Sequence, residues 1–192
     1  MVCAIIFLKY VCGHAAGFSR GGSPSEKGVL HKLSTKKEIR QLAPAELEEA
    51  LALVWEVFAE FEAPEYSQEG IEEFWRYIDA EYMIMQVGEG AMTFWGAFED
   101  DYLVGVCAFR GLTHISLLFV DGEYHRRGIG TALVKKAASD CKRLDPSVDV
   151  LTVNASPYGV PFYKALGFVP TGEMTEEDGM RFMPMKIEGL HV

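Results

Sequence analysis

Two glycines close to two arginines form the group of residues in this chain best suited to bind an anion. Residues 124–134 have the sequence YHRRGIGTALV. Gly128 and Gly130 lack a Cβ atom, so the backbone there can turn tightly and approach a ligand closely. Arg126 and Arg127 supply positive charge. Where such a turn opens a helix, the first N–H groups and the positive end of the helix dipole favour phosphate. We therefore predict a pyrophosphate-binding loop.

A strand and a helix are predicted on the two sides of this loop. Residues 115–120, ISLLFV, are apolar and rich in strand formers. After the loop, apolar residues recur at spacings of three and four, which is the period of a helix buried along one face. These residues are Leu133, Ala137, Cys141 and Leu144. The order strand, glycine turn, helix is the one that a phosphate site requires.

Two other phosphate-binding loops do not fit the segment. A P-loop requires Gly-x-x-x-x-Gly-Lys-Ser/Thr, and the chain contains no such run. A dinucleotide-binding loop requires a third glycine near the start of a domain. Here that position is Leu133, and the loop comes late in the chain.

A second motif further along the chain indicates which ligand the loop holds. The apolar, β-branched run 148–153 ends at Asn154, and residues 162–168 read FYKALGF. With the loop, this order resembles the GNAT N-acetyltransferases. In that family a coenzyme A loop of pattern Gln/Arg-x-x-Gly-x-Gly/Ala opens a helix, a later strand ends at Asn, and a short helix carries Phe-Tyr-x-x-Leu-Gly-Phe. His125 departs from the pattern, but backbone amides do most of the binding, so we expect it to be tolerated. The resemblance covers about residues 36–188.

The resemblance implies the GNAT acyl-CoA N-acyltransferase fold, an α/β fold with a mixed central sheet of about six to seven strands flanked by helices. The elements read from the sequence follow the order βααβββαβαββ that this fold implies. Strands are expected at 38–42, 93–98, 102–109, 114–120, 148–153, from 168 to 175 and at 180–187. Helices are expected after Pro44 and after Ser67, where Ile71, Phe74, Trp75 and Ile78 would share a buried face.

The resemblance also implies acetyl-CoA as acyl donor, an amine as acceptor and no metal. In family fashion, the pantetheine arm would pair with the strand at Leu118, Phe119 and Val120, where a backbone N–H would hold the thioester carbonyl. Asn154 would hydrogen-bond the cofactor. The loop residues expected to bind it, mainly through backbone amides, are His125, Arg126, Arg127, Gly128, Ile129, Gly130 and Thr131.

Tyr163 matches the tyrosine that lies near the cofactor sulfur in many GNAT proteins. A phenol, whose pKa is about 10, is protonated at neutral pH and can donate to a thiolate of pKa about 8.5. We therefore expect Tyr163 both to contact the cofactor and to act as general acid.

The general base is not specified by any motif. An acceptor ammonium with a pKa of about 10.4 must lose its proton before it can attack. His114, at the start of a predicted strand, is our first candidate. Glu62 and Glu65, between the first two predicted helices, and Glu123, beside the loop, are alternatives.

Composition agrees with a domain that has a substantial core. The chain has 192 residues, of which 49% are hydrophobic, and no apolar run is long enough to predict a transmembrane helix. Its four cysteines, at 3, 12, 107 and 141, show no metal or disulfide spacing, which fits a reducing cytoplasm. A net charge of −10 argues against a nucleic-acid partner. A homodimer is compatible with the resemblance.

Residues 1–34 differ from the rest, because residues 17–28 are rich in Gly, Ser and Pro. We expect a disordered N-terminal extension over 1–34 and the N-acetyltransferase domain over 35–192. Two other functions stay open: an acyl-CoA-binding sensor that keeps the fold without turnover, and an interaction protein that uses the tail and the acidic surface.

Overall fold

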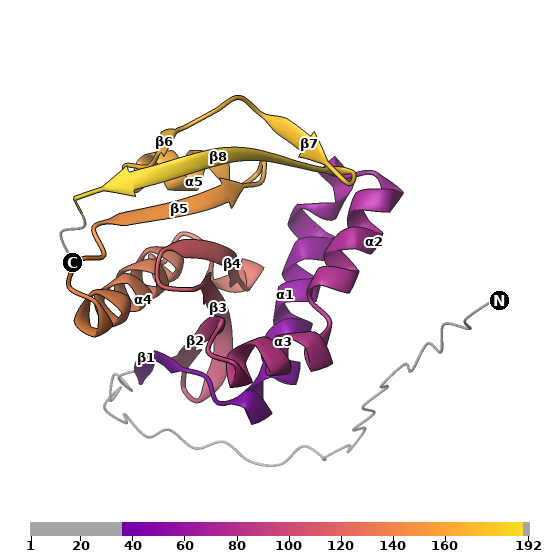
Figure 1. Cartoon of the computed structure of the whole chain (residues 1–192). Helices are drawn as coiled ribbons and strands as arrows, with labels where there is room; N and C mark the ends of the chain where they lie inside the picture. Colours follow the sequence, from indigo (N-terminus) through magenta and orange to yellow (C-terminus); the bar gives the residue numbers. More distant parts are fainter. Residues whose placement is uncertain (1–35, 190–192) are drawn as a thin grey trace, which may run out of the picture. The chain divides into compact units, whose positions relative to one another are not determined.

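A computed structural model describes residues 36–189, so the expectations for residues 1–34 lie outside the described part of the chain. Within it, eight strands form one sheet in the order β1-β2-β3-β4-β5-β8-β6, with β7 paired to β8 (Figure 1). The pairs are antiparallel except for β4 with β5, so the sheet is mixed, as predicted. The strands are β1 (Lys37–Gln41), β2 (Met92–Glu99), β3 (Tyr102–Arg110), β4 (His114–Val120), β5 (Val150–Ala155), β6 (Val169–Pro170), β7 (Thr175–Glu177) and β8 (Met180–Glu188).

Helices cover both faces of the sheet and make a hydrophobic core on each (Figure 1). One core packs α4 and α5 against the sheet, and the other packs α1, α2 and α3 against the opposite face. Burying such large apolar side chains is the main favourable term in folding. The helices are α1 (Leu47–Phe61), α2 (Gln68–Tyr77), α3 (Ala80–Gly88), α4 (Ile129–Leu144) and α5 (Val160–Ala165).

The parallel strands β4 and β5 separate soon after they meet. Their register contains only His114 with Thr152 and Ile115 with Val153. From residue 116 onward, β4 stays paired with β3, while β5 stays paired with β8. Beyond Ile115, the backbone N–H and C=O groups on the β5 side of β4 are therefore available to bind a ligand.

A β-bulge at Ser116 marks the point of separation. Ile115 pairs with Phe109 and Leu117 with Ala108, so Ser116 has no partner residue on β3. The bulge changes the alternation of side chains, because Ile115 packs in the core of α4 and α5 whereas Leu117 packs in the other core. Bulges bend a strand in this way and are frequent beside active sites.

The structure corrects three details of the predicted elements. Helix α3 was not expected; it begins after Asp79, whose side chain accepts a hydrogen bond from the Tyr82 N–H at 2.9 Å. Trp75 is 57% exposed and touches Trp55 edge-on instead of lying in the core, and Leu144 is 70% exposed at the end of α4. The strand expected up to residue 175 is divided into the short strands β6 and β7.

Candidate active site

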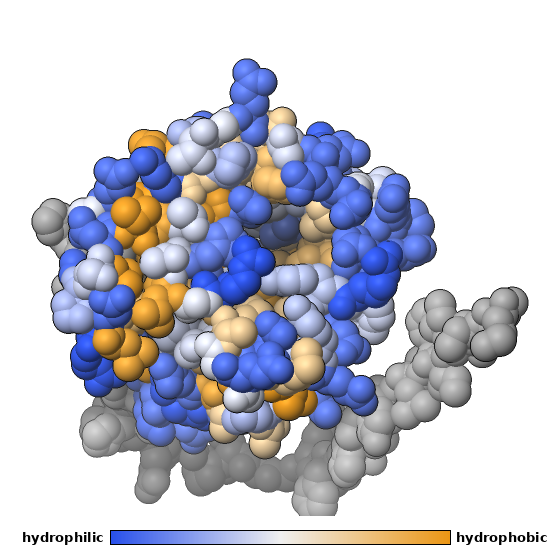
Figure 2. Space-filling view, in the orientation of Figure 1, coloured by the Kyte–Doolittle hydropathy of each residue, from blue (hydrophilic) through white to orange (hydrophobic). Residues whose placement is uncertain are grey.

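A cavity of about 1080 Å³ lies where β4 and β5 separate. In Figure 2 the surface is hollowed between α1–α2 and the strands β5 and β8. The cavity reaches the predicted phosphate loop at one end and the tip of the β7–β8 hairpin at the other, since Gly128 and Met180 both line it. It thus brings together residues that are distant in the sequence.

The predicted phosphate loop has the geometry that an anion site needs. Arg126 and Gly128 adopt left-handed conformations, with φ of 62° and 80°. Helix α4 follows directly, and the Ala132 N–H donates to the Gly128 carbonyl oxygen at 3.0 Å as the first bond of its ladder. The amides of the preceding turn, residues 129–131, have no intrahelical acceptor. They open at the positive end of a sixteen-residue helix.

The side chains of His125 and Arg127 bind other groups of the protein. His125 donates from Nε2 to the Val120 carbonyl oxygen at 2.6 Å and lies 4.8 Å from the Phe61 ring, measured between centroids. The Arg127 guanidinium is 3.6 Å from the Glu99 carboxylate and stacks over Tyr124. His125 lines the cavity, but Arg127 does not. The charge of the Arg127 side chain is thus paired with Glu99, and its contribution to the phosphate site stays a prediction.

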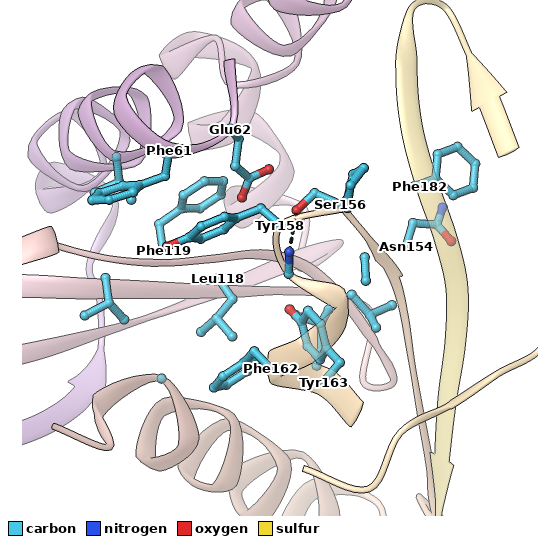
Figure 3. A pocket seen from close by; sticks show the side chains of 18 of the residues that line it. Phe61, Glu62, Leu118, Phe119, Asn154, Ser156, Tyr158, Phe162, Tyr163 and Phe182 are labelled. Atoms are coloured by element: carbon cyan, nitrogen blue, oxygen red, sulfur yellow. Dashed lines mark hydrogen bonds between the residues drawn. The ribbon is translucent and has the colours of Figure 1, made fainter. Parts of the chain in front are cut away.

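The open edge of β4 and the end of β5 form the walls of the cavity. Leu118, Phe119 and Val120 all line it and lie beyond the last β4–β5 pair. Asn154 is exposed and lies across the cavity, next to Phe182 (Figure 3). A ligand that entered between the strands could pair with β4 as an added strand does.

Tyr163 rises from α5 into the same cavity. The side chain is 6% exposed and packs edge-on against Phe162 and Phe168. Burial, helped by Cys107 and Glu62, raises the pKa of its phenol well above the usual range. The phenol therefore stays protonated at neutral pH and can donate a hydrogen bond.

Comparisons with known proteins agree with this geometry. The family model described as the acetyltransferase (GNAT) domain matches residues 62–189. The chain belongs to the GNAT acetyltransferase family. A curated relative, the uncharacterized N-acetyltransferase YafP of Escherichia coli (strain K12), is 30% identical over 131 residues, which are 68% of this chain and 80% of that protein. The protein is thus an acetyl-transferring enzyme.

Solved structures show the same fold in other GNAT proteins. A GCN5-related N-acetyltransferase from Rhodopseudomonas palustris has 22% identity and a TM-score of 0.69, over 83% of this chain and 99% of that chain. The PaiA N-acetyltransferase from Thermoplasma acidophilum, solved in complex with coenzyme A, has 24% identity and a TM-score of 0.64, over 80% of this chain and 99% of that one. These likenesses confirm the predicted fold class.

In this GNAT enzyme the four candidate bases occupy different places. His114 lines the cavity where β4 and β5 meet, and its Nδ1 lies 2.9 Å from the Thr152 hydroxyl. Burial and the positive charge of Arg110 lower the pKa of His114. Glu62 also lines the cavity, whereas Glu65 and Glu123 are exposed and do not.

Several cavity residues of the enzyme were not singled out from the sequence. Ser156 and Tyr158 follow Asn154 directly, so their place after the strand could have drawn attention to them. Tyr66 and Arg181 come from opposite ends of the domain, and the Tyr66 hydroxyl donates to the Arg181 carbonyl oxygen at 3.0 Å. No short-range pattern predicts such a contact.

Two features are absent from the described residues, 36–189. They contain no group of three His, Cys, Asp or Glu side chains that could hold a metal ion. No helix among them is long and apolar enough to cross a membrane.

Proposed function

We propose that this enzyme transfers the acetyl group of acetyl-CoA to a primary amine of a small molecule or peptide, by direct attack in a ternary complex. The observation that carries the proposal is the separation of β4 from β5 directly above a glycine loop that opens a helix. A thioester arm can then pair with β4 while its pyrophosphate lies on the loop. The coenzyme A complex of the PaiA relative supports the choice of donor.

In this proposal, each part of the donor would lie against a different part of the cavity. The pyrophosphate would take the amides of residues 126–131 at the start of α4. The pantetheine arm would pair with Leu118, Phe119 and Val120, one of whose N–H groups would stabilise the oxyanion. Asn154 would hydrogen-bond the arm from the other wall of the cavity.

Tyr163 would donate a hydrogen bond and then a proton to the leaving sulfur. When the C–S bond breaks, its electron pair stays on sulfur, which needs a hydrogen bond and then a proton. Because the pKa of Tyr163 is raised, the phenol stays protonated and can donate a hydrogen bond, but it gives up its proton reluctantly. The hydroxyl can give its proton to sulfur and take in its place the proton that the acceptor nitrogen loses when the amide forms.

Direct attack fits the described cysteines better than an acetyl-cysteine intermediate does. Cys107 and Cys141 are both buried, and burial raises their pKa, for Cys141 to about 11. A buried thiol held protonated is a poor nucleophile.

The experiment is thiol release from acetyl-CoA with a panel of amines, with mass spectrometry of the products. We expect one amine class to release thiol and gain one acetyl group, with intersecting double-reciprocal plots. Tight coenzyme A binding without turnover on any amine would favour the sensor instead. Failure of coenzyme A to raise the melting temperature would contradict the donor itself.

A further inference from the structure

Glu62 is held at the edge of the cavity by the end of helix α1. Its backbone N–H donates to the Phe58 carbonyl oxygen at 2.9 Å, which closes the last turn of the helix. The preceding residue, Phe61, lies 5.8 Å from the Tyr158 ring, measured between centroids, and 4.8 Å from His125. The helix end therefore fixes where the Glu62 side chain begins, as a reactive group requires.

The carboxyl group of Glu62 is turned across the cavity toward Ser156 (Figure 3). Ser156 lies on the turn after β5, and its hydroxyl oxygen accepts from the Gly159 N–H at 3.0 Å. With that bond fixing the oxygen, the hydroxyl hydrogen is available for the carboxylate. A hydroxyl that donates toward a carboxylate favours its ionised form.

Burial of Glu62 has the larger, opposite effect. It raises the pKa of the carboxyl to about 7, although Ser156 acts to lower it. A carboxylate with this pKa is largely ionised just above neutral pH and is far more basic than an ordinary one. That is the range in which general bases work best.

Within residues 36–189, no cation contributes to the pKa shift of the Glu62 carboxyl. Arg181, from β8, lies 3.4 Å from the Glu65 carboxylate. Tyr66 donates to a backbone carbonyl oxygen. Burial and, to a smaller extent, the charge of Glu62 raise the pKa of both Tyr66 and Tyr163. The phenol of Tyr163, which would lie near the cofactor sulfur, is thus close enough to interact electrostatically with the Glu62 carboxylate. Tyr66 and Tyr163 interact electrostatically with the carboxyl. The other titratable and charged residues that line the same cavity are Glu73, Tyr77, Arg110, His114, Tyr124, His125, Arg126, Tyr158 and Arg181.

We infer that Glu62 is the general base that deprotonates the acceptor ammonium, and that Ser156 is a positioning residue for its carboxyl group. This inference rests on the acetyl transfer proposed above. The Glu62 carboxylate takes one proton from the ammonium, and the freed nitrogen lone pair attacks the thioester carbonyl carbon. The tetrahedral intermediate collapses with loss of the C–S bond, the second nitrogen proton passes to sulfur, and Glu62 returns its proton to solvent.

The first test replaces the carboxyl group without changing its size. Glu62→Gln should lower kcat by about 10²-fold, the range of a lost general base, and should remove the rise of activity with pH centred near 7. The acceptor ammonium adds its own rise near pH 10, which is well separated. Glu60→Gln, two residues away, exposed and outside the cavity, is the matched control and should keep both the rate and the pH profile.

Two results would overturn the inference. One is a Glu62→Gln variant that keeps the rise near pH 7 at nearly the wild-type rate. The other is loss of that rise in His114→Gln but not in Glu62→Gln, which would assign the base to His114. In both cases the wild type still acetylates amines, so the proposed function survives. Wild type that neither binds coenzyme A nor releases thiol contradicts the proposed function instead.

The second test concerns Ser156. Ser156→Ala removes the hydroxyl that favours the ionised carboxylate, so the pKa of Glu62 should rise and the activity profile should move to higher pH. Ser156→Thr, which keeps a hydroxyl, should restore the wild-type profile. Coenzyme A titrations on each variant check that the cavity is intact. A lower rate with an unmoved profile in Ser156→Ala would show a purely structural role for Ser156.

Discussion

Tyr163 reaches the cavity from a helix of only six residues, and its ring is held on two sides by Phe162 and Phe168. A side chain packed in this way is placed by its neighbours and not by its hydroxyl. Removing the oxygen should therefore leave the ring in place while it removes the proposed hydrogen-bond donor to the cofactor sulfur.

We expect Tyr163→Phe to lower kcat by about 10²-fold, the scale of a lost acid catalyst, with little change in KM for acetyl-CoA. Steady-state kinetics at saturating amine measures both constants. Tyr102→Phe, on a tyrosine that is 75% exposed in the β2–β3 hairpin, provides the control. Equal turnover in Tyr163→Phe and wild type would remove Tyr163 from the mechanism.

Gly128 and Gly130 serve different purposes in the loop. A Cβ at Gly128 would meet no protein atom within 4 Å, but the residue has a φ of +80°. A Cβ at Gly130 would lie 3.3 Å from the Phe162 ring. Gly128 thus supplies backbone conformation and open space for a ligand, and Gly130 also supplies packing room for α5.

Gly128→Ala should raise KM for acetyl-CoA by about tenfold and cost roughly 1–2 kcal/mol of stability, the penalty of a left-handed alanine. Gly130→Val should raise KM too, with a larger fall in melting temperature, because Phe162 must move. Kinetics and thermal unfolding measure the two effects. An unchanged KM in Gly128→Ala would show that no phosphate lies against that residue.

At the scale of elements, a hydrogen bond from His125 Nε2 to the Val120 carbonyl oxygen, at 2.6 Å, links the predicted phosphate loop to β4. His125→Ala should remove this bond and the contact with Phe61, so the affinity for acetyl-CoA should fall by about tenfold, the equivalent of one hydrogen bond. His125→Gln, with a side-chain N–H of its own, should recover part of the loss. Calorimetric titration with coenzyme A decides between these outcomes, and equal binding by all three proteins would contradict them.

Helix α4 is anchored to the sheet by a buried carboxylate. Asp140 accepts from the Trp95 indole N–H at 3.0 Å and from Lys136 Nζ at 2.6 Å and 2.7 Å, and Arg143 adds a bond at 3.2 Å. Although burial acts to raise its pKa, these bonds and charges together hold the pKa of Asp140 below the ordinary value of 3.8. The carboxylate therefore stabilises the folded state above pH 3.8, and this contribution is lost as pH falls through the lowered pKa.

Asp140→Asn should thus lower the free energy of unfolding at pH 7 by about 1–3 kcal/mol, and the difference from wild type should shrink below pH 4. Urea unfolding at pH 7 and at a series of pH values below 3.8 measures the difference. Asp149→Asn, which alters a mostly exposed pair with Lys142, is the control and should change little. An Asp140→Asn deficit that stays undiminished down to the lowest pH at which both proteins still fold would speak against an ionic origin.

The sequence predicts the elements of this fold better than it predicts the site. The strand before the loop and helix α4 have strong periodic signals, and the structure has both. Trp75 has the spacing of a core residue but is exposed, because periodicity does not say how far a helix face is covered. Glu62 and Ser156 face each other across 94 positions of sequence, and such a contact depends on the topology of the sheet.

At the scale of the whole chain, the described residues that line the cavity, out of 36–189, lie between Val57 and Phe182. The described fold begins at Lys36, whose N–H donates to the Asp100 carboxylate at 2.9 Å. Strand β1 then pairs with β2 over five positions, and Arg40 binds Glu46 through two bonds. We therefore propose that the domain starts at residue 35, and that the residues before it are not needed for acetyl transfer.

Deleting residues 1–34 should leave kcat and KM near their wild-type values and change the melting temperature by no more than about 2 °C, the size of a surface effect in a chain of this length. Deleting residues 1–41 is the matched control. It also removes β1 and exposes the edge of β2, where Trp95 and Ala97 are buried. That loss of pairing and apolar burial should lower the melting temperature by well over 5 °C. If both deletions destabilise the protein equally, or if the shorter deletion alone abolishes thiol release, then residues 1–34 belong to the working enzyme.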